Sequence, residues 1–229
     1  MRKRKVAVFD IDGTIFRSSL LIELTDALIQ EGIFPSVVTK IYKNAYRGWL
    51  ERKDSYDKYI QAVILAFESH IKGTSHSKFK KIAKQVAAFH KNRVYRFTRD
   101  LVKRLKKSGF FLLAISHSPL EIVQEFCAHL GFNKVYGRVI EVDKRGRMTG
   151  KLLHPELILN KDRILARAVE KHNLTLRGSV GVGDTGSDIS FLSMVTRPIC
   201  FNPNQKLYRH WKKKQWTIAV ERKDVIYYH

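Results

Sequence analysis

Short apolar runs alternate with amphipathic stretches over most of the second half of the chain. Three runs have the length of a buried strand and end in polar residues, namely residues 5–10, 110–116 and 179–184. Apolar positions at helical spacing lie between or beside them, in residues 96–107, 120–130 and 161–172. Residues 199–202 and 217–220 are weaker strand candidates. The alternation of strands and helices predicts an α/β fold with a parallel sheet.

The stretch from residue 16 to residue 93 interrupts this alternation. It contains no convincing buried strand, and it shows four helical patterns, in residues 19–30, 36–50, 56–68 and 77–92. We therefore expect a helical insertion after the first strand, with residues 1–15 and 94–229 forming the α/β core. Ser18 or Ser19 can cap the first inserted helix, because a serine hydroxyl accepts a bond from a free backbone N–H.

Two pairs of acids lie where predicted strands end. Asp10 and Asp12 follow the first strand, and Asp184 and Asp188 follow the strand at 179–184. Because the carboxyl ends of parallel strands meet at one edge of the sheet, we expect the four side chains to converge. Four carboxylates in a dry cleft repel one another, so a hard divalent cation is the natural compensation. Mg²⁺ suits this chemistry, whereas the spacing lacks the terminal Glu of a twelve-residue Ca²⁺ loop.

A hydroxyl and an ammonium group extend this set. Ser116 ends the strand at 110–116, and Lys161 opens the helix at 161–172. Both groups can donate to phosphoryl oxygens, and the lysine charge can offset negative charge in the transition state. Taken alone, a serine in this position is usually a turn former and a lysine is usually solvated. Together with the acids, they favour phosphate chemistry.

These motifs resemble those of the haloacid dehalogenase superfamily, most closely its phosphoserine phosphatase-like branch, subfamily IB. The matching segments, in family order, are residues 10–14 (DIDGT), 116–119 (SHSP), Lys161 and 181–188 (GVGDTGSD). The resemblance implies a Rossmann-like core with a helical cap of the C1 type, formed by residues 16–93. It also implies a phosphoric monoester hydrolase that forms an aspartyl-phosphate, with Mg²⁺ as cofactor and a phosphorylated small molecule as substrate.

The resemblance further assigns roles by position. Asp10 corresponds to the nucleophile, and Asp12 to the acid/base that protonates the leaving group and then activates water. Asp10 and Asp184 by their side chains, and Asp12 by its backbone carbonyl, correspond to the Mg²⁺ ligands. Asp188 would support the metal through water or orient Lys161. The groups expected to contact the phosphoryl group or the substrate are Ser116, the His117 amide, Lys161 and Ser187.

A second lysine competes with Lys161 for the phosphate-binding role. Residues 135–142 and 147–152 flank a polar turn, which predicts a β-hairpin, and Lys151 lies in its second strand. A hairpin position fits the resemblance less well than the start of a helix, so Lys161 is preferred.

The segment after the first motif departs from the phosphoserine enzymes of this branch. Those enzymes use a cap Glu to hold the substrate amine and a cap Arg to hold its carboxylate. Here Ser19 stands at about the position of that Glu, and no Arg stands convincingly in residues 56–63. Loss of charge partners for the substrate weakens its recognition, so we expect phosphoserine to be a poor substrate.

The net charge of +22, from 43 Lys and Arg against 21 Asp and Glu, adds an alternative. Such a surface attracts polyanions. The protein could therefore bind nucleic acid or an anionic membrane surface, or act on their phosphates. The other interpretation is that the basic residues only keep the surface solvated. No stretch approaches the ~18 apolar residues of a membrane span. Cys127 and Cys200 lack metal or redox spacing. We expect a cytoplasmic protein, with a peripheral place at a membrane as the alternative.

Overall fold

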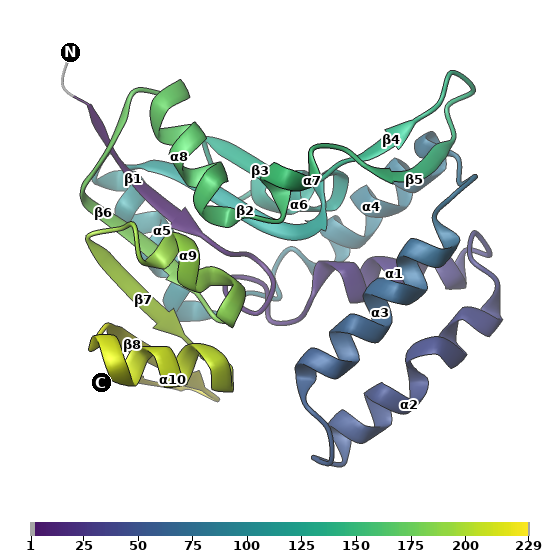
Figure 1. Cartoon of the computed structure of the whole chain (residues 1–229), viewed down its shortest axis with the longest axis horizontal. Coiled ribbons are helices and arrows are strands. Elements are labelled where there is room, and N and C mark those ends of the chain that lie inside the picture. Colours follow the sequence, from purple (N-terminus) through teal and green to yellow (C-terminus); the bar gives the residue numbers. More distant parts are fainter. Residues whose placement is uncertain (1–2, 229) are drawn as a thin grey trace.

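A seven-stranded sheet forms the centre of the computed structural model, which describes residues 3–228 (Figure 1). The strand order is β3-β2-β1-β6-β7-β8-β9, and every neighbouring pair is parallel except β8 and β9. The strands are β1 (Arg4–Phe9), β2 (Phe111–Pro119), β3 (Lys134–Arg138), β6 (Leu174–Gly183), β7 (Arg197–Phe201), β8 (Thr217–Arg222) and β9 (Val225–Tyr228). The expected α/β fold with a parallel, Rossmann-like sheet is therefore confirmed.

Alternate side chains of the central strands enter two separate hydrophobic clusters, one on each face of the sheet. On β1, Ala7 and Phe9 enter the first cluster, and Val6 and Val8 enter the second. The first cluster includes side chains of α5 (Arg96–Lys107) and α6 (Leu120–Ala128). The second includes side chains of α7 (Pro155–Ile158), α8 (Lys161–Lys171), α9 (Ile189–Leu192) and α10 (Gln205–Lys214). Helices thus cover both faces, which explains why these strands are continuously apolar.

Four helices follow β1 as an insertion. They are α1 (Leu20–Gln30), α2 (Thr39–Leu50), α3 (Tyr56–His70) and α4 (His76–His90), with a 3₁₀ turn at Ser36–Val38. The two ends of the insertion lie together, because the Arg17 N–H donates to the Arg93 carbonyl at 3.0 Å. Side chains of all four helices enter the first hydrophobic cluster. Helices α1 and α4 pack against α6, whereas α2 and α3 project beyond them (Figure 1).

The predicted hairpin is wrong in its first half. Residues 134–138 form β3 and pair in parallel with β2 at the edge of the main sheet. The hairpin itself consists of β4 (Ile140–Val142) and β5 (Met148–Leu152). The segment 135–142 thus contains parts of two strands that belong to different sheets. The periodicity of apolar residues along the chain cannot show with which strand a segment pairs.

The insertion also contacts this hairpin. The Met148 N–H donates to the Thr74 carbonyl at 2.9 Å, in the connection between α3 and α4.

Among the helices of residues 3–228, none combines the length and the apolar character that a membrane crossing needs.

The junction between insertion and core depends on an aromatic pair. The rings of Phe16 and Phe126 lie 5.2 Å apart, edge to face, and both side chains are fully or almost fully buried. We predict that Phe126→Ala lowers the free energy of unfolding by about 3–5 kcal/mol, because it leaves a cavity. Urea denaturation measures this loss. Phe89→Ala is the matched control, since Phe89 is 84% exposed, and should change stability by less than about 0.5 kcal/mol. Equal effects of the two variants would contradict the prediction.

Candidate active site

The sequence-predicted acids converge at the carboxyl ends of three adjacent strands. β1 lies between β2 and β6: the chain passes from β1 to β2 and β3 on one side, and later returns to β6 and β7 on the other side. Asp10 follows β1, Ser116 lies near the end of β2, and Asp184 follows β6. In parallel sheets, such a switch in strand order opens a crevice beyond the strand ends. The topology therefore places all three residues at one crevice.

A buried lysine joins two of the carboxylates. The Lys161 ammonium group donates to Oδ1 of Asp10 and to Oδ1 of Asp188, each at 2.6 Å. Lys161 is only 2% exposed, so little water competes for these bonds. The other Asp188 oxygen accepts from the backbone N–H groups of Asp184 and Thr185, at 3.0 and 2.9 Å. Asp188 thus holds both Lys161 and the loop that carries Asp184.

The competing lysine lies elsewhere. Lys151 is exposed on β5, where its ammonium group is 3.8 Å from Glu141. Of the two lysines, only Lys161 contacts the carboxylates of Asp10 and Asp188.

Negative charge exceeds positive charge in this cluster. Burial, together with the charges of Asp188 and Asp12, raises the pKa of Asp10 to about 7, despite the opposing effect of Lys161. Burial and the charges of Asp10 and Asp188 likewise raise the pKa of Asp184 well above its ordinary range. Burial would lower the pKa of Lys161, but the two carboxylates that it contacts raise it. One ammonium group therefore does not balance these acids.

The arrangement fits a hard divalent cation. Asp10, Asp184 and Asp188 each offer a carboxylate oxygen, and these oxygens lie within 4.8 Å of one another. A set made only of oxygen donors is what Mg²⁺ prefers, and its charge would relieve the repulsion described above. The side chain of Asp12 is not part of this set, and the expected contribution of its backbone carbonyl stays a prediction.

The turn after β1 is built around the Asp184 carboxylate. Thr14 Oγ1 donates to Asp184 Oδ1 at 3.1 Å. Gly13 has a φ of +75°, and a Cβ atom there would lie 2.1 Å from Asp184 Oδ2. Only glycine therefore lets the DIDGT turn approach this carboxylate so closely.

Asp12 is fixed by three hydrogen bonds from two other parts of the chain. Its Oδ1 accepts from the Leu20 N–H at 2.5 Å, and its Oδ2 accepts from Ser116 Oγ and Ser118 Oγ, at 2.6 and 2.9 Å. Burial nevertheless raises the pKa of Asp12, against the lowering effect of these bonds. Asp12 thus connects β1, β2 and the first residue of α1. The expected serine cap is corrected here: Ser19 precedes α1 but its side chain makes no capping bond, and Asp12 takes the N–H of Leu20.

Ser118 was missed from the sequence. Its hydroxyl is bonded to Asp12 and lines the cavity described below, whereas the cavity lining does not include Ser116. The signal was present, because Ser116 and Ser118 are two positions apart in an extended segment and so share one face. The contact of Ser116 with a phosphoryl group stays a prediction.

A cavity of about 330 Å³ lies between these carboxylates and α3 of the insertion. The insertion contributes one face of α3, with Tyr56, Asp57, Ile60, Gln61 and Ile64. Asp10, Asp12, Lys161 and Asp184 line the opposite wall. The inserted helices therefore contribute directly to the shape of the site.

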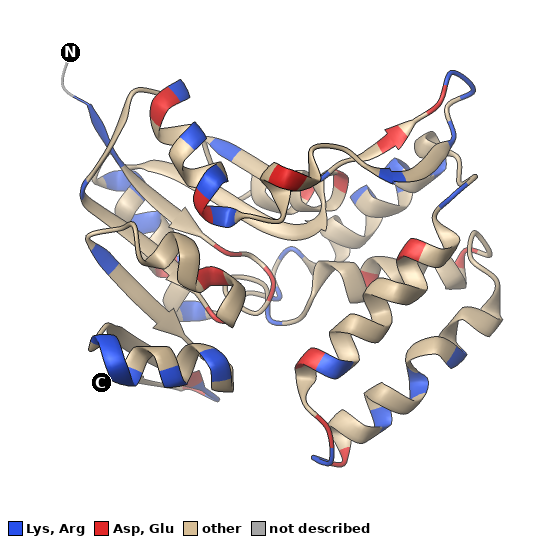
Figure 2. Cartoon of the chain, viewed as in Figure 1, with Lys and Arg blue, Asp and Glu red and all other residues tan. Residues whose placement is uncertain are grey.

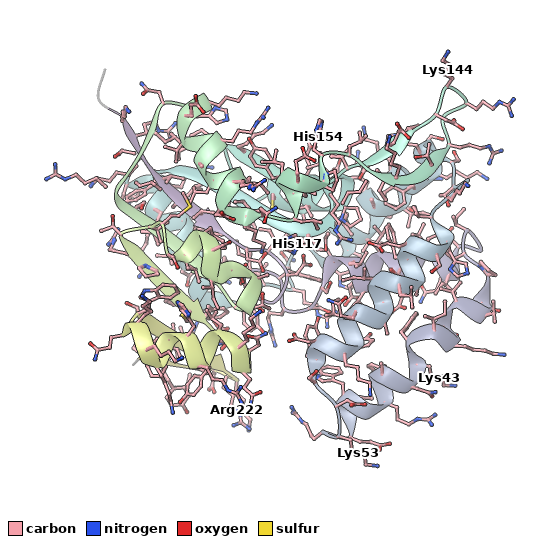
Figure 3. The ribbon with its side chains drawn as sticks, viewed as in Figure 1. Lys43, Lys53, His117, Lys144, His154 and Arg222 are labelled. Atoms are coloured by element: carbon pink, nitrogen blue, oxygen red, sulfur yellow. The ribbon has the colours of Figure 1, made fainter. Side chains whose placement is uncertain are left out.

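His117 and Ser187 also line the cavity. Figure 3 shows His117 near the centre of the molecule, between the sheet and the insertion. Burial, together with the charges of Lys161 and Arg138, lowers the pKa of the His117 imidazole to about 3, so the ring is neutral at physiological pH. Ser187 is exposed, and its hydroxyl lies 2.8 Å from that of Thr185.

Residues 7–193 match the family model of haloacid dehalogenase-like hydrolases. The chain belongs to this family. Over 224 residues it is 23% identical to a histidinol-phosphatase of Neisseria meningitidis, covering 94% of this chain and 98% of that protein. It is 22% identical to a phosphoserine phosphatase of Archaeoglobus fulgidus, covering 90% of this chain but only 55% of that longer protein. The expected assignment to the phosphatases of this family is confirmed.

Solved structures share the fold. A Bordetella pertussis protein described as of unknown function superposes with a TM-score of 0.72 at 17% identity, over 95% of this chain and 98% of that one. A phosphoserine phosphatase solved as a phospho-aspartyl intermediate analogue gives a TM-score of 0.62 at 22% identity, over 97% and 96% of the two chains.

We predict that Mg²⁺ raises the melting temperature of this protein. A ligand that binds only the folded state stabilises it by about 2.7 kcal/mol at a hundredfold excess over Kd. Thermal unfolding with MgCl₂, against KCl at equal ionic strength, measures the shift, and Asp184→Asn should remove most of it. Asp100→Asn, an acid on α5 outside the cavity lining, should retain the full shift. Equal responses to the two salts would show that no specific Mg²⁺ site exists.

Proposed function

We propose that this chain is a Mg²⁺-dependent phosphatase that hydrolyses a phosphate monoester through a phosphorylated Asp10. The observation that carries the proposal is the Asp10 carboxylate, which lies at the end of β1, is held by Lys161 and lines a cavity together with Asp12 and Asp184. Family membership and the names of the relatives support the same reaction class.

In the first step, an Asp10 oxygen attacks phosphorus, a new O–P bond forms, and the bond from phosphorus to the ester oxygen breaks. Lys161 holds the Asp10 carboxylate in place and offsets negative charge that develops on the phosphoryl oxygens. Asp12 delivers a proton to the departing alkoxide. Its raised pKa supports this role, because more of the acid form is present near neutral pH than for an ordinary Asp.

In the second step, Asp12, now ionised, takes a proton from water, and the resulting hydroxide attacks the phosphorus. The bond to Asp10 breaks, phosphate leaves, and both carboxyl groups return to their starting states. Bound Mg²⁺, held by Asp10, Asp184 and the Asp12 carbonyl, would supply charge that draws in and orients the phosphate group.

We further propose that residues 16–93 act as a cap that selects the leaving group. The α3 side chains that line the cavity support this role, since they lie opposite the carboxylates. Ser19 lines the cavity, and no arginine of residues 3–228 does. The cavity lining therefore lacks the Glu and the Arg expected for phosphoserine, and the charged side chains that it offers from elsewhere are Asp57 and Lys206. A role in binding nucleic acid or membrane, raised by the net charge, gains no support from the comparisons.

We predict that Asp10→Asn lowers Mg²⁺-dependent hydrolysis of p-nitrophenyl phosphate by a factor of about 10³ or more, because the amide is a far weaker nucleophile. Phosphate release under saturating substrate measures the effect. Asp100→Asn should retain activity within about twofold, since this acid lies outside the cavity lining. Hydrolysis that survives both Asp10→Asn and excess chelator would refute the proposal.

We also predict that phosphoserine is turned over poorly. In a panel of sugar, amino-acid, nucleotide and lipid phosphates with Mg²⁺ present, its kcat/KM should lie at least about tenfold below that of the best substrate, because the Glu and Arg expected to hold its ammonium and carboxylate groups are missing from the cavity lining. Comparable values for phosphoserine and the best alternative would show that other groups of the cap replace the missing pair.

A further inference from the structure

A second and larger groove opens beside the catalytic cavity. It has a volume of about 760 Å³ and lies between the α2–α3 connection of the cap and helix α10 of the core. Basic side chains line it from both sides: Arg52 from the cap, and Lys206, Arg209 and Lys213 from α10. Figure 2 shows Lys and Arg positions on α10 and on the turn between α2 and α3.

These cations are not neutralised within the protein. Within residues 3–228, none of the four basic side chains forms an ion pair with a carboxylate. Of the two acids that line the groove, Asp54 is bonded to Lys58 at 2.8 Å, while Asp57 accepts from Asn204 Nδ2 at 3.5 Å. The groove therefore carries an excess of positive charge, which favours an anionic occupant.

One further group of the groove lacks a protein partner. His210 lines it, and its Nε2 atom is buried with no hydrogen-bond partner in the described part of the chain. A buried polar atom without a partner is uncommon in folded proteins. This atom is covered by protein, and the imidazole ring packs against Trp216 with the ring centroids 4.8 Å apart.

The groove is continuous with the catalytic cavity. Tyr56, Asp57, Asn204 and Lys206 line both spaces. The Asn204 N–H donates to the Asp184 carbonyl at 2.8 Å, so the start of α10 is attached to the loop of a proposed metal ligand. The Lys206 side chain lies against Gly186 of the same loop. A leaving group that extends from a phosphate at Asp10 thus reaches the groove past Lys206.

We propose that this groove is a subsite for a second phosphate group, so that the preferred substrate is a small bisphosphate, cleaved at the phosphate that reaches Asp10. The inference rests on the proposed phosphatase activity and adds the chemistry of the leaving group. Arg52 and α10 approach the second phosphate from opposite sides, so its binding also holds the cap against the core.

The test compares hydrolysis of hexanediol bisphosphate with that of hydroxyhexyl phosphate, which lacks the second phosphate. The wild-type protein should show a kcat/KM at least about tenfold higher for the bisphosphate. The double variant Arg209→Ala/Lys213→Ala should lose most of this preference, since two partly exposed charge pairs together contribute a factor of about ten. Hydrolysis of p-nitrophenyl phosphate by this variant should stay within about twofold of wild type, because the variant leaves the catalytic residues unchanged.

The matched control is Lys212→Ala/Lys214→Ala, which removes the same charge from the same helix at positions outside the groove lining. It should keep the preference for the bisphosphate. An equal loss in both double variants would show a general effect of surface charge and overturn the subsite. A wild-type protein without preference would overturn it as well. If the wild-type protein does not hydrolyse p-nitrophenyl phosphate, or if Asp10→Asn hydrolyses it equally well, the underlying phosphatase proposal is refuted instead.

Discussion

The buried ammonium group of Lys161 is the interaction on which the site depends. It bonds to Asp10 and Asp188 at equal distances, and Asp188 in turn holds the backbone of the loop that carries Asp184. A charge pair removed from water in this way is stabilising only when its geometry is good and its remaining hydrogen bonds are satisfied. Here the second oxygen of Asp188 accepts backbone N–H groups, so the pair is well satisfied.

The carboxylates around this lysine outnumber the positive charges, and their repulsion destabilises the folded protein unless a cation offsets it. Asp10 is buried, Asp12 and Asp184 are half-buried, and all three have raised pKa values, because removal from water penalises their charged forms. Catalytic sites often hold such strained electrostatic arrangements, because the same charges that repel one another at rest can bind a metal ion and move protons during the reaction. The folded core supplies the rigidity that keeps them together, since β1 is paired on both sides and its apolar side chains are fully buried.

The sequence was most informative where chemistry coincides with strand ends. Asp10, Asp184 and Lys161 were identified from residue type, order and predicted context, and the topology brings them together because adjacent parallel strands share one edge. The two parts of the 135–142 run could not be separated, since the pairing of β3 with β2 depends on contacts far apart in the chain. The groove beside α10 could not be predicted from the sequence either. Arg52 and Arg209 lie more than a hundred residues apart, and only the folded chain places them around one space. Ser118, by contrast, could have been predicted, because side chains alternate along a strand and Ser118 lies on the same face as Ser116.

The hydrogen bond from the Leu20 N–H to Asp12 restricts how this protein can admit and release ligands. A swing of α1 away from the sheet would pull the first turn of that helix off the Asp12 carboxylate and leave both groups without their partner. Helix α4 is similarly tied down by its packing against α6. These contacts attach α1 and α4 more firmly to the core than α2 and α3, so a movement of the insertion would bend the segments that lead into and out of the α2–α3 pair. Entry and exit would then depend on α2 and α3 alone, while Asp12, the proposed proton donor, keeps its alignment.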